Sequence, residues 1–254
     1  MGTIVAIGGG EIGRPKKSGG RYPIETTAID KEIIRLSKKK NPKVLFIPTA
    51  SKDSESYYEV FKRHYTKLGA KVDVLYLTKK QYSYKELESR ILSTDIIYVG
   101  GGNTLYMMNL WRKLKVDKIL KKAFDKNIIL SGLSAGSICW FSFGISDSRT
   151  YKHNPKALTK VRGLGFVPAI ICPHYDTEIH RHSATKKYAK TSPLVTLALD
   201  NCSAFAYTNE RFRILTTKKS AKAQLIYYKQ NRYYKKKILE TKDFQNVQTL
   251  FTKK

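Results

Sequence analysis

The stretch Ile128-Ile129-Leu130-Ser131-Gly132-Leu133-Ser134-Ala135-Gly136 indicates the fold and the chemistry together. It joins a short apolar strand to a G-x-S-x-G turn, and residues 137–141 continue as a helical pattern. This order is typical of a nucleophile elbow, where small flanking residues permit a strained turn that exposes a serine. The motif also occurs by chance, with a purely structural serine, but the strand and helix around it favour a nucleophile. We therefore predict Ser134 as nucleophile and the Ala135 N–H as an oxyanion donor.

Apolar strands alternate with amphipathic helices on both sides of this stretch. The predicted strands are residues 3–7, 44–47, 72–77, 95–99, 128–130, 166–172 and 195–199. The predicted helices are residues 27–38, 54–67, 84–92, 104–112 and 116–124. Such alternation predicts an α/β fold with a mostly parallel sheet covered on both faces. In sheets of this kind, ligands bind beyond the carboxyl ends of the strands.

The pattern changes after about residue 205. Residues 211–215, 223–228 and 233–238 have the character of short antiparallel strands, with a turn at Gln230-Asn231. The tyrosine pairs in the last two strands fit cross-strand packing better than stacking on bases. We expect one domain over residues 1–254, with a small antiparallel β extension at about 205–254.

The 254 residues carry a net charge of +28, with 36 lysines and 12 arginines. A basic surface is one signature of a nucleic-acid binder. Specific readers of phosphates and bases rely on arginine forks, however, and these lysines are spread along the whole chain. We therefore favour a lysine-rich surface without a specific nucleic-acid partner, and its positive field would suit acidic small substrates.

Other sequence features concern the compartment and the cofactors. No apolar run reaches membrane-spanning length, the N-terminus lacks signal-peptide features, and the three cysteines are widely spaced. We expect a cytoplasmic protein without a membrane partner. The chain has no H-E-x-x-H and no Cys/His ligand cluster, so we expect no metal and no cofactor.

Two further glycine-rich turns follow predicted strands. Residues 8–13 fit G-x-G-x-x-G, with Asp30 downstream, but the following residues, which include Pro15, cannot begin the helix that a dinucleotide site needs. A tight turn is the better interpretation. Gly100-Gly101-Gly102-Asn103-Thr104 leaves backbone N–H groups open to a substrate oxygen, and Asn103 or Thr104 can cap the next helix.

A serine nucleophile needs a base, and the candidates are the five histidines His64, His153, His174, His180 and His182. We select His174 because it follows the strand at 166–172, at the carboxyl edge. We expect His64 to be a solvated helix residue and the other three to lie on the surface. Asp200, which follows the strand at 195–199, is the preferred orienting acid. The order serine, histidine, aspartate disfavours an α/β-hydrolase fold.

Four motifs together resemble peptidase family S51, which includes dipeptidase E and cyanophycinase. They are residues 46–51 (Phe-Ile-Pro-Thr-Ala-Ser), residues 99–104, the elbow at 132–136 and Pro173-His174-Tyr175. The resemblance covers roughly residues 1–215. It implies a three-layer α/β/α sandwich similar to class I glutamine amidotransferases, and a cytosolic serine exopeptidase that hydrolyses short peptides.

The resemblance also implies roles for individual residues. The family's nucleophile falls on Ser134 and its base on His174, and its acidic member falls on Asp200, with Asp147 as the fallback. The family's oxyanion donors fall on Gly102 and Ala135.

The substrate and the oligomeric state stay open. The segment at 180–187 departs from the G-E-T-R-type stretch of dipeptidase E, which leaves a preference for N-terminal aspartate open. Arg181 and Asn103 are our candidate substrate-binding residues, and residues 175–190 form a predicted loop that can close over substrate. We expect a monomer or a homodimer. The alternatives are a non-catalytic polyanion or nucleic-acid binder on this fold, and an esterase or amidase on non-peptide substrates.

Overall fold

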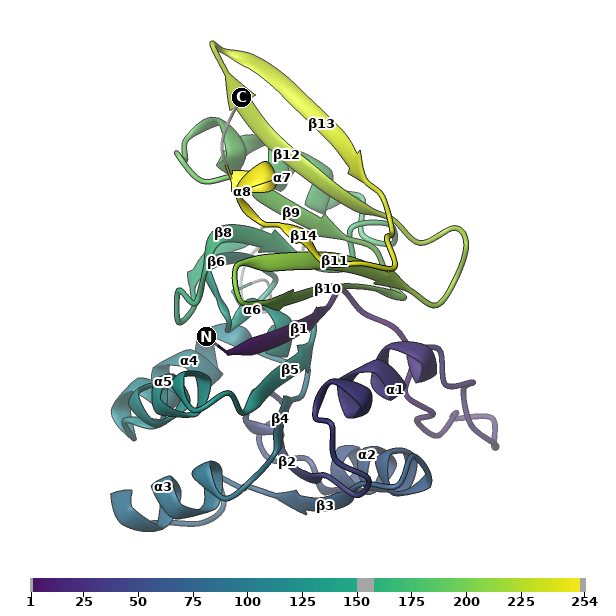
Figure 1. Ribbon diagram of the computed structural model, residues 1–254, viewed down its shortest axis with the longest axis vertical. Coiled ribbons are helices and arrows are strands. Elements are labelled where there is room, and N and C mark those ends of the chain that lie inside the picture. The colour runs from purple at the N-terminus through teal and green to yellow at the C-terminus, as the bar shows by residue number, and fades with distance from the viewer. Residues whose placement is uncertain (1, 150–157, 252–254) are drawn as a thin grey trace.

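The computed structural model describes residues 2–149 and 158–251, which form two β-sheets with helices packed around them (Figure 1). The first sheet has the strand order β14-β11-β10-β1-β5-β4-β2-β3. The strands are β1 (Thr3–Ile7), β2 (Lys43–Ile47), β3 (Lys71–Val74), β4 (Ile96–Val99), β5 (Ile129–Leu133), β10 (Ser203–Thr208), β11 (Arg211–Thr216) and β14 (Gln245–Asn246). From β3 to β1 every pair is parallel, and β10, β11 and β14 are added in antiparallel fashion.

Helices cover both faces of the parallel part of this sheet, as Figure 1 shows. On one face lie α1 (Thr27–Leu36) and α2 (Glu55–Lys67); on the other lie α3 (Tyr84–Leu92), α4 (Thr104–Lys113) and α5 (Val116–Asp125). Successive side chains of a strand point to opposite faces. In β4, for example, Ile97 and Val99 pack with α3, α4 and α5, whereas Ile96 and Tyr98 pack with α1 and α2. The predicted α/β sandwich with a mostly parallel sheet is confirmed.

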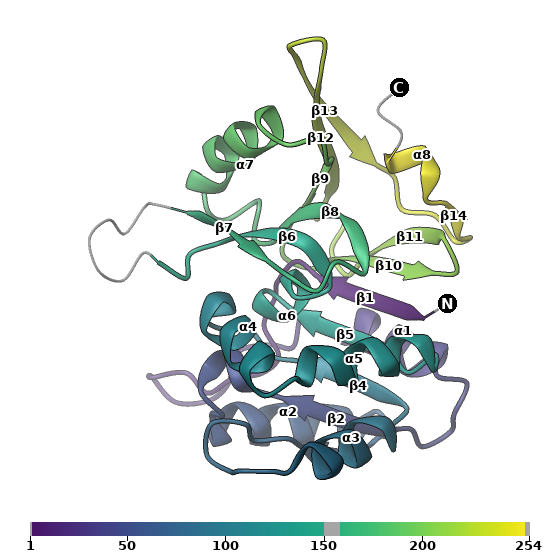
Figure 2. The same cartoon turned by 90° about the vertical axis from the view of Figure 1, so that its left-hand side faces the viewer.

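A second sheet stacks above the first, with the order β13-β12-β9-β8-β6-β7 (Figure 2). Its strands are β6 (Phe141–Ser146), β7 (Thr159–Arg162), β8 (Val167–Cys172), β9 (Thr196–Leu199), β12 (Ala223–Lys229) and β13 (Arg232–Ile238). The predicted strands at 166–172 and 195–199 are therefore real, but they belong to this second sheet. Hydrophobic pattern identifies a buried strand and does not say which neighbour it pairs with.

The strands predicted at 211–215, 223–228 and 233–238 are present as β11, β12 and β13 and are shared between the sheets, whereas β10 and β14 were not predicted. β11 and β14 lie at one edge of the first sheet, whereas β12 and β13 lie at one edge of the second. Tyr227 is opposite Tyr234 in the β12–β13 hairpin, with stacked rings whose centroids are 5.1 Å apart. The predicted cross-strand tyrosine packing is confirmed.

Two predicted segments differ in the structure. Residues 175–190 contain the helix α7 (His180–Lys190), which packs on the second sheet through buried side chains such as Thr185 and Ala189. The predicted helix at 137–141 is the short α6 (Ala135–Ile138), after which the chain turns directly into β6. Tertiary packing overrides local pattern in both places.

The predicted exposure of His64 is wrong. His64 is buried in α2, and its Nε2 lies 2.8 Å from Oδ2 of the fully buried Asp30. The same carboxylate accepts hydrogen bonds from the Thr26 hydroxyl at 2.7 Å and the Tyr65 hydroxyl at 2.8 Å. Asp30 therefore ties α1 to α2, which is a structural role.

We expect Asp30→Ala to lower the free energy of unfolding by about 3 kcal/mol, because it leaves buried hydrogen-bonding groups without their partner. Urea denaturation followed by circular dichroism measures this change. Lys31→Ala, on the exposed side of the same helix, is the control and should change stability by less than about 0.5 kcal/mol. An equal effect of both variants would contradict the role given to Asp30.

Candidate active site

The carboxyl end of β1 positions the candidate site through three consecutive backbone carbonyls. The oxygen of Ile7 accepts the N–H of Ser134 at 3.1 Å, and that of Gly8 accepts the N–H of His174 at 3.0 Å. The oxygen of Gly9 accepts the N–H of Cys202 at 2.9 Å. Three segments from β5, β8 and β9 are thus fixed to one strand end, although they belong to two different sheets.

Ser134 lies on a strained turn between β5 and α6, with φ of 57° and ψ of −112°. Both glycines of the elbow are needed because the backbone there is crowded. A Cβ atom on Gly136 would lie 2.0 Å from the carbonyl oxygen of Val99, and one on Gly132 would lie 2.4 Å from that of Gly136. The strand–turn–helix geometry predicted for residues 128–136 is present, with a shorter helix.

His174 faces Ser134 across this turn. Its Nε2 lies 2.8 Å from Ser134 Oγ, which is the hydrogen-bond distance that a nucleophile and its base require. Burial lowers the pKa of His174, and the nearby charge of Arg181 lowers it further. The hydrogen bond to Asn201 and the charges of Glu178 and Asp147 act in the opposite direction. The net lowering favours the neutral imidazole that a general base needs.

The side chain that orients His174 is Asn201. Its Oδ1 lies 2.7 Å from Nδ1 of His174, so the ring can donate its Nδ1–H and keep Nε2 free to accept a proton. The amide Nδ2 of Asn201 donates to the Thr177 hydroxyl at 3.3 Å, and the backbone N–H donates to the carboxylate of Asp176 at 2.9 Å. These contacts fix the amide with its oxygen towards the ring.

The predicted contact between Asp200 and His174 is therefore corrected. The carboxylate of Asp200 is buried and accepts the backbone N–H of Lys222 at 2.9 Å, on the other side of the turn. Successive residues at a strand end point in opposite directions, so a prediction by distance from the strand is easily displaced by one residue. The sequence signal that could have identified Asn201 is its place directly after Asp200, at the same strand end.

Gly9 explains the first glycine-rich turn. A Cβ atom at this position would lie 1.9 Å from Asn201 Oδ1 and 2.4 Å from His174 Nδ1, so only glycine permits the contact between these two side chains. The turn at residues 8–10 thus passes directly against the histidine–asparagine pair. This close approach fits the predicted tight turn and gives the glycines a reason other than dinucleotide binding.

The second glycine-rich turn lies on the other side of the serine. A Cβ atom on Gly101 would lie 3.5 Å from Ser134 Cβ, which places this backbone in contact with the nucleophile. Gly102 has a φ of 137°, and a Cβ there would collide with the Ala50 carbonyl oxygen at 2.2 Å. Gly102 lines the same cavity as Ser134, and Ala135 directly follows Ser134 in the elbow.

A cavity of about 610 Å³ opens over Ser134 and His174. Its walls contain two cationic side chains, Lys52 and Arg181, and two acidic ones, Asp147 and Glu178. Arg181 is buried, and it donates through Nε to Glu178 at 2.7 Å and through Nη1 to the Ile145 carbonyl at 2.9 Å. This guanidinium is therefore held rigidly at the cavity wall.

The remaining predicted site residues also have defined places. Asn103 lines the cavity, but its side chain caps α4 by accepting the Tyr106 N–H at 2.9 Å and donates to the Ser148 carbonyl at 3.2 Å. Asp147 lies in the same wall rather than beside the histidine ring's Nδ1. His153 lies outside the described residues.

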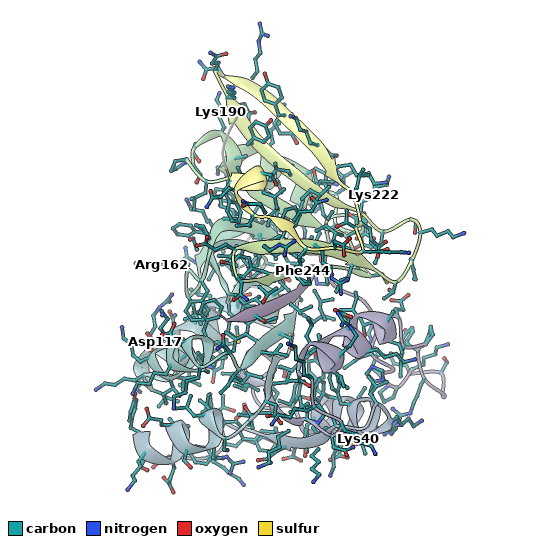
Figure 3. All side chains as sticks on the ribbon, viewed as in Figure 1. Lys40, Asp117, Arg162, Lys190, Lys222 and Phe244 are labelled. Atoms are coloured by element: carbon teal, nitrogen blue, oxygen red, sulfur yellow. The ribbon has the colours of Figure 1, made fainter. Side chains whose placement is uncertain are left out.

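Residues 2–149 and 158–251 hold no group of three or more His, Cys, Asp or Glu side chains that could bind a metal ion. In the same residues no helix combines the length and the apolar character needed to span a bilayer. Three of the 36 lysines, Lys40, Lys190 and Lys222, lie on different parts of the surface in Figure 3.

We expect Asn201→Asp to raise the pKa of His174, because a carboxylate in contact with the ring stabilises the imidazolium. Titration of the imidazole proton resonances by NMR measures this shift. Asp200→Asn is the matched control, and it should shift the His174 pKa far less, since the Asp200 carboxylate accepts the Lys222 N–H and Asn201 contacts the ring. A shift caused by Asp200→Asn alone would restore Asp200 as the partner of the ring.

Comparisons with known proteins identify the family of the chain. Residues 17–215 match the profile of Peptidase family S51. The uncharacterized peptidase YgaJ of Bacillus subtilis (strain 168) is 34% identical over 225 residues, which are 88% of this chain and 91% of that protein. The uncharacterized peptidase Lmo0363 of Listeria monocytogenes is 31% identical over 137 residues, which are 52% of this chain and 65% of that protein.

A solved structure shares the fold over nearly the full length. The crystal structure of a peptidase from an acI-B1 Actinobacterium superposes with a TM-score of 0.71 and covers 97% of each chain, at 17% sequence identity. That likeness concerns the arrangement of helices and strands, while the profile match and the identity to YgaJ establish the relationship. The chain belongs to peptidase family S51.

Proposed function

We propose that this peptidase is a serine exopeptidase that hydrolyses short peptides through a Ser134–His174–Asn201 triad. The observation that carries the proposal is the continuous hydrogen-bonded chain from Ser134 Oγ through the imidazole to the amide oxygen of Asn201. Because the serine is strained, faces an open cavity and contacts a base of lowered pKa, it has the features of an activated nucleophile.

The mechanism follows from this chain of contacts. His174 Nε2 takes the proton of Ser134 Oγ, and the oxygen attacks the scissile carbonyl carbon. The backbone N–H groups of Gly102 and Ala135 stabilise the negative charge on the tetrahedral intermediate. His174 then donates the proton to the leaving amine, and the C–N bond breaks to give an acyl-enzyme. Water, deprotonated by His174, attacks the ester and releases the acid, which restores Ser134.

Asn201 holds the imidazole in the tautomer that this sequence of steps needs. A neutral amide fixes ring orientation, but it stabilises the imidazolium less than a carboxylate does. The charges of Glu178 and Asp147 favour the imidazolium from a distance. The arrangement resembles in its logic the Cys-His-Asn sites of papain-like proteases, where an amide also orients the histidine.

Cavity size and charge support short peptides as substrates. A volume of about 610 Å³ holds a small molecule, and both signs of charge line its walls. The termini of a dipeptide carry the same two charges and can pair with Arg181 or Lys52 at one end and with Asp147 or Glu178 at the other. An N-terminal aspartate would present a further carboxylate to the cationic side chains.

We expect the purified protein to cleave members of a dipeptide panel weighted towards N-terminal aspartate, and Ser134→Ala to lose this activity by at least about 10⁴-fold. Release of free amino acids measures cleavage, and the same panel reports whether aspartate is favoured. Full activity in Ser134→Ala would refute the mechanism. Hydrolysis of esters or non-peptide amides without cleavage of any peptide would instead indicate an esterase or amidase.

Gly9→Ala tests whether the contact between His174 and Asn201 is needed for catalysis. The added methyl group must displace His174 or Asn201, and a displacement of about 1 Å in such a site typically costs about 100-fold in rate. We expect kcat to fall by about this factor for every substrate, with little change in the far-ultraviolet circular dichroism. Unaltered kcat in a folded Gly9→Ala protein would contradict the role of the pair.

A further inference from the structure

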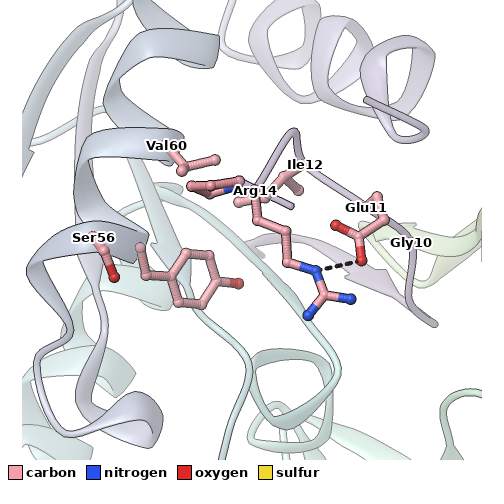
Figure 4. A pocket seen from close by; sticks show the side chains of 8 residues that line it. Gly10, Glu11, Ile12, Arg14, Ser56 and Val60 are labelled. Atoms are coloured by element: carbon pink, nitrogen blue, oxygen red, sulfur yellow. Dashed lines mark hydrogen bonds and ion pairs between the residues drawn. The ribbon is translucent and has the colours of Figure 1, made fainter. Parts of the chain in front are cut away.

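A second cavity lies between the loop at residues 10–15 and α2, and we call it the α2 pocket. Its volume is about 320 Å³. It is lined by Gly10, Glu11, Ile12, Arg14, Pro15, Ser56, Tyr57 and Val60. Most of these side chains are apolar, or present an apolar stem as Arg14 does, and Figure 4 shows Arg14 extended along the pocket with its guanidinium paired to Glu11.

The walls of the α2 pocket are held in place by contacts within the chain. The loop folds back on itself through isolated bridges between Ile12 and Ile24 and between Pro15 and Arg21. The backbone N–H of Glu11 also donates to the Glu25 carboxylate at 3.0 Å, and the carbonyl oxygen of Glu11 accepts the Glu25 N–H at 2.8 Å. On the other side, α2 is anchored by its buried residues. Contacts within the chain therefore fix both walls of the pocket.

Two contacts connect the α2 pocket to the catalytic residues. The hydroxyl of Tyr57, a wall residue, accepts the N–H of Gly101 at 3.2 Å, and Gly101 is in contact with Ser134. Gly10, at the other end of the pocket, follows Gly9, which passes against His174 and Asn201. A single residue, Gly101 at one end and Gly9 at the other, thus separates the pocket from the proposed triad.

The α2 pocket and the cavity over Ser134 have no lining residue in common and differ in polarity. The α2 pocket is bounded by α2, on the face of the sheet that α1 and α2 cover. The cavity over Ser134 includes residues before α4, after β6 and on α7. Four charged side chains line the cavity over Ser134. The α2 pocket carries only the Arg14–Glu11 pair, whose charges compensate each other at the mouth.

We propose that the α2 pocket binds the apolar side chain of one of the two residues that the scissile bond joins. The inference rests on the proposed peptidase mechanism and adds a specificity: charged groups of the substrate occupy the cavity over Ser134, and a large aliphatic or aromatic side chain occupies the α2 pocket. The volume limits the pocket to about one such side chain, and burial of its surface supplies the affinity.

Ser56→Phe tests this assignment because Ser56 is an exposed residue of α2 whose enlarged side chain would fill the pocket. Thr66→Phe is the matched control, since Thr66 is also an exposed hydroxyl residue of α2 and does not line the pocket. The substrates are two dipeptide series, X-Gly and Gly-X, with X as Phe, Leu, Ala or Gly. The quantity measured is kcat/KM for each substrate.

In one of the two series, we expect the unmodified enzyme to prefer Phe or Leu over Gly by at least about tenfold. Ser56→Phe should reduce this preference about tenfold or more, and Thr66→Phe should preserve it. A loss that is equal for every X would show that Ser56→Phe disturbs the catalytic residues rather than a side-chain pocket. Wild-type rates that do not depend on X in either series would also overturn the proposal.

A measurement of binding to an inactive variant tests the α2 pocket independently of the proposed catalysis. Calorimetric titration of Ser134→Ala with Gly-Phe, Phe-Gly and Gly-Gly should show tighter binding of one phenylalanine dipeptide, and the double variant with Ser56→Phe should lose the difference. If the enzyme cleaves no peptide, the proposed function fails, yet this titration still tests the pocket. Equal affinity for all three dipeptides would refute the α2 pocket as a side-chain site, whatever the catalytic result.

Discussion

The site depends on three hydrogen bonds that the carbonyls of Ile7, Gly8 and Gly9 accept at the carboxyl end of β1. Each carbonyl holds a different segment: the elbow after β5, the histidine after β8 and the turn after β9. The latter two segments come from the second sheet. A triad needs its atoms within a few tenths of an ångström of hydrogen-bond distance, and one extended strand end is a rigid reference for all three segments.

This convergence requires backbone conformations that are costly. Ser134 and His174 both have positive φ, at 57° and 53°, and such strain costs about 1–3 kcal/mol per residue. The apolar core under the site supplies the compensation, because β1, β4 and β5 are buried on both faces between the helix layers. In the site, glycine occupies points of close approach, such as Gly9 against the imidazole and Gly136 against the end of β4.

The electrostatics of the site differ from those of a triad with an acid. Asn201 orients the ring without adding charge, and burial together with Arg181 lowers the pKa of His174. These surroundings favour the neutral imidazole, whereas a carboxylate in the place of Asn201 would favour the imidazolium. Three nearby carboxylates bond to groups other than the imidazole. Asp176 accepts the backbone N–H of Asn201, Asp200 accepts the Lys222 N–H, and Glu178 pairs with Arg181.

Local pattern determined much of the structure, because strands, helices and turns have short-range physical causes. The elbow around Ser134, the approximate boundaries of α2 and α3, and the edge position of His174 all follow from residue order. Family S51 was evident from the same motifs. Only tertiary structure decided that β8 and β9 join a second sheet, that His64 is buried against Asp30, and that Asn201 rather than Asp200 meets the imidazole. Strand pairing and the direction of one side chain at a turn depend on contacts between distant segments, and a one-residue shift there exchanges an aspartate for an asparagine.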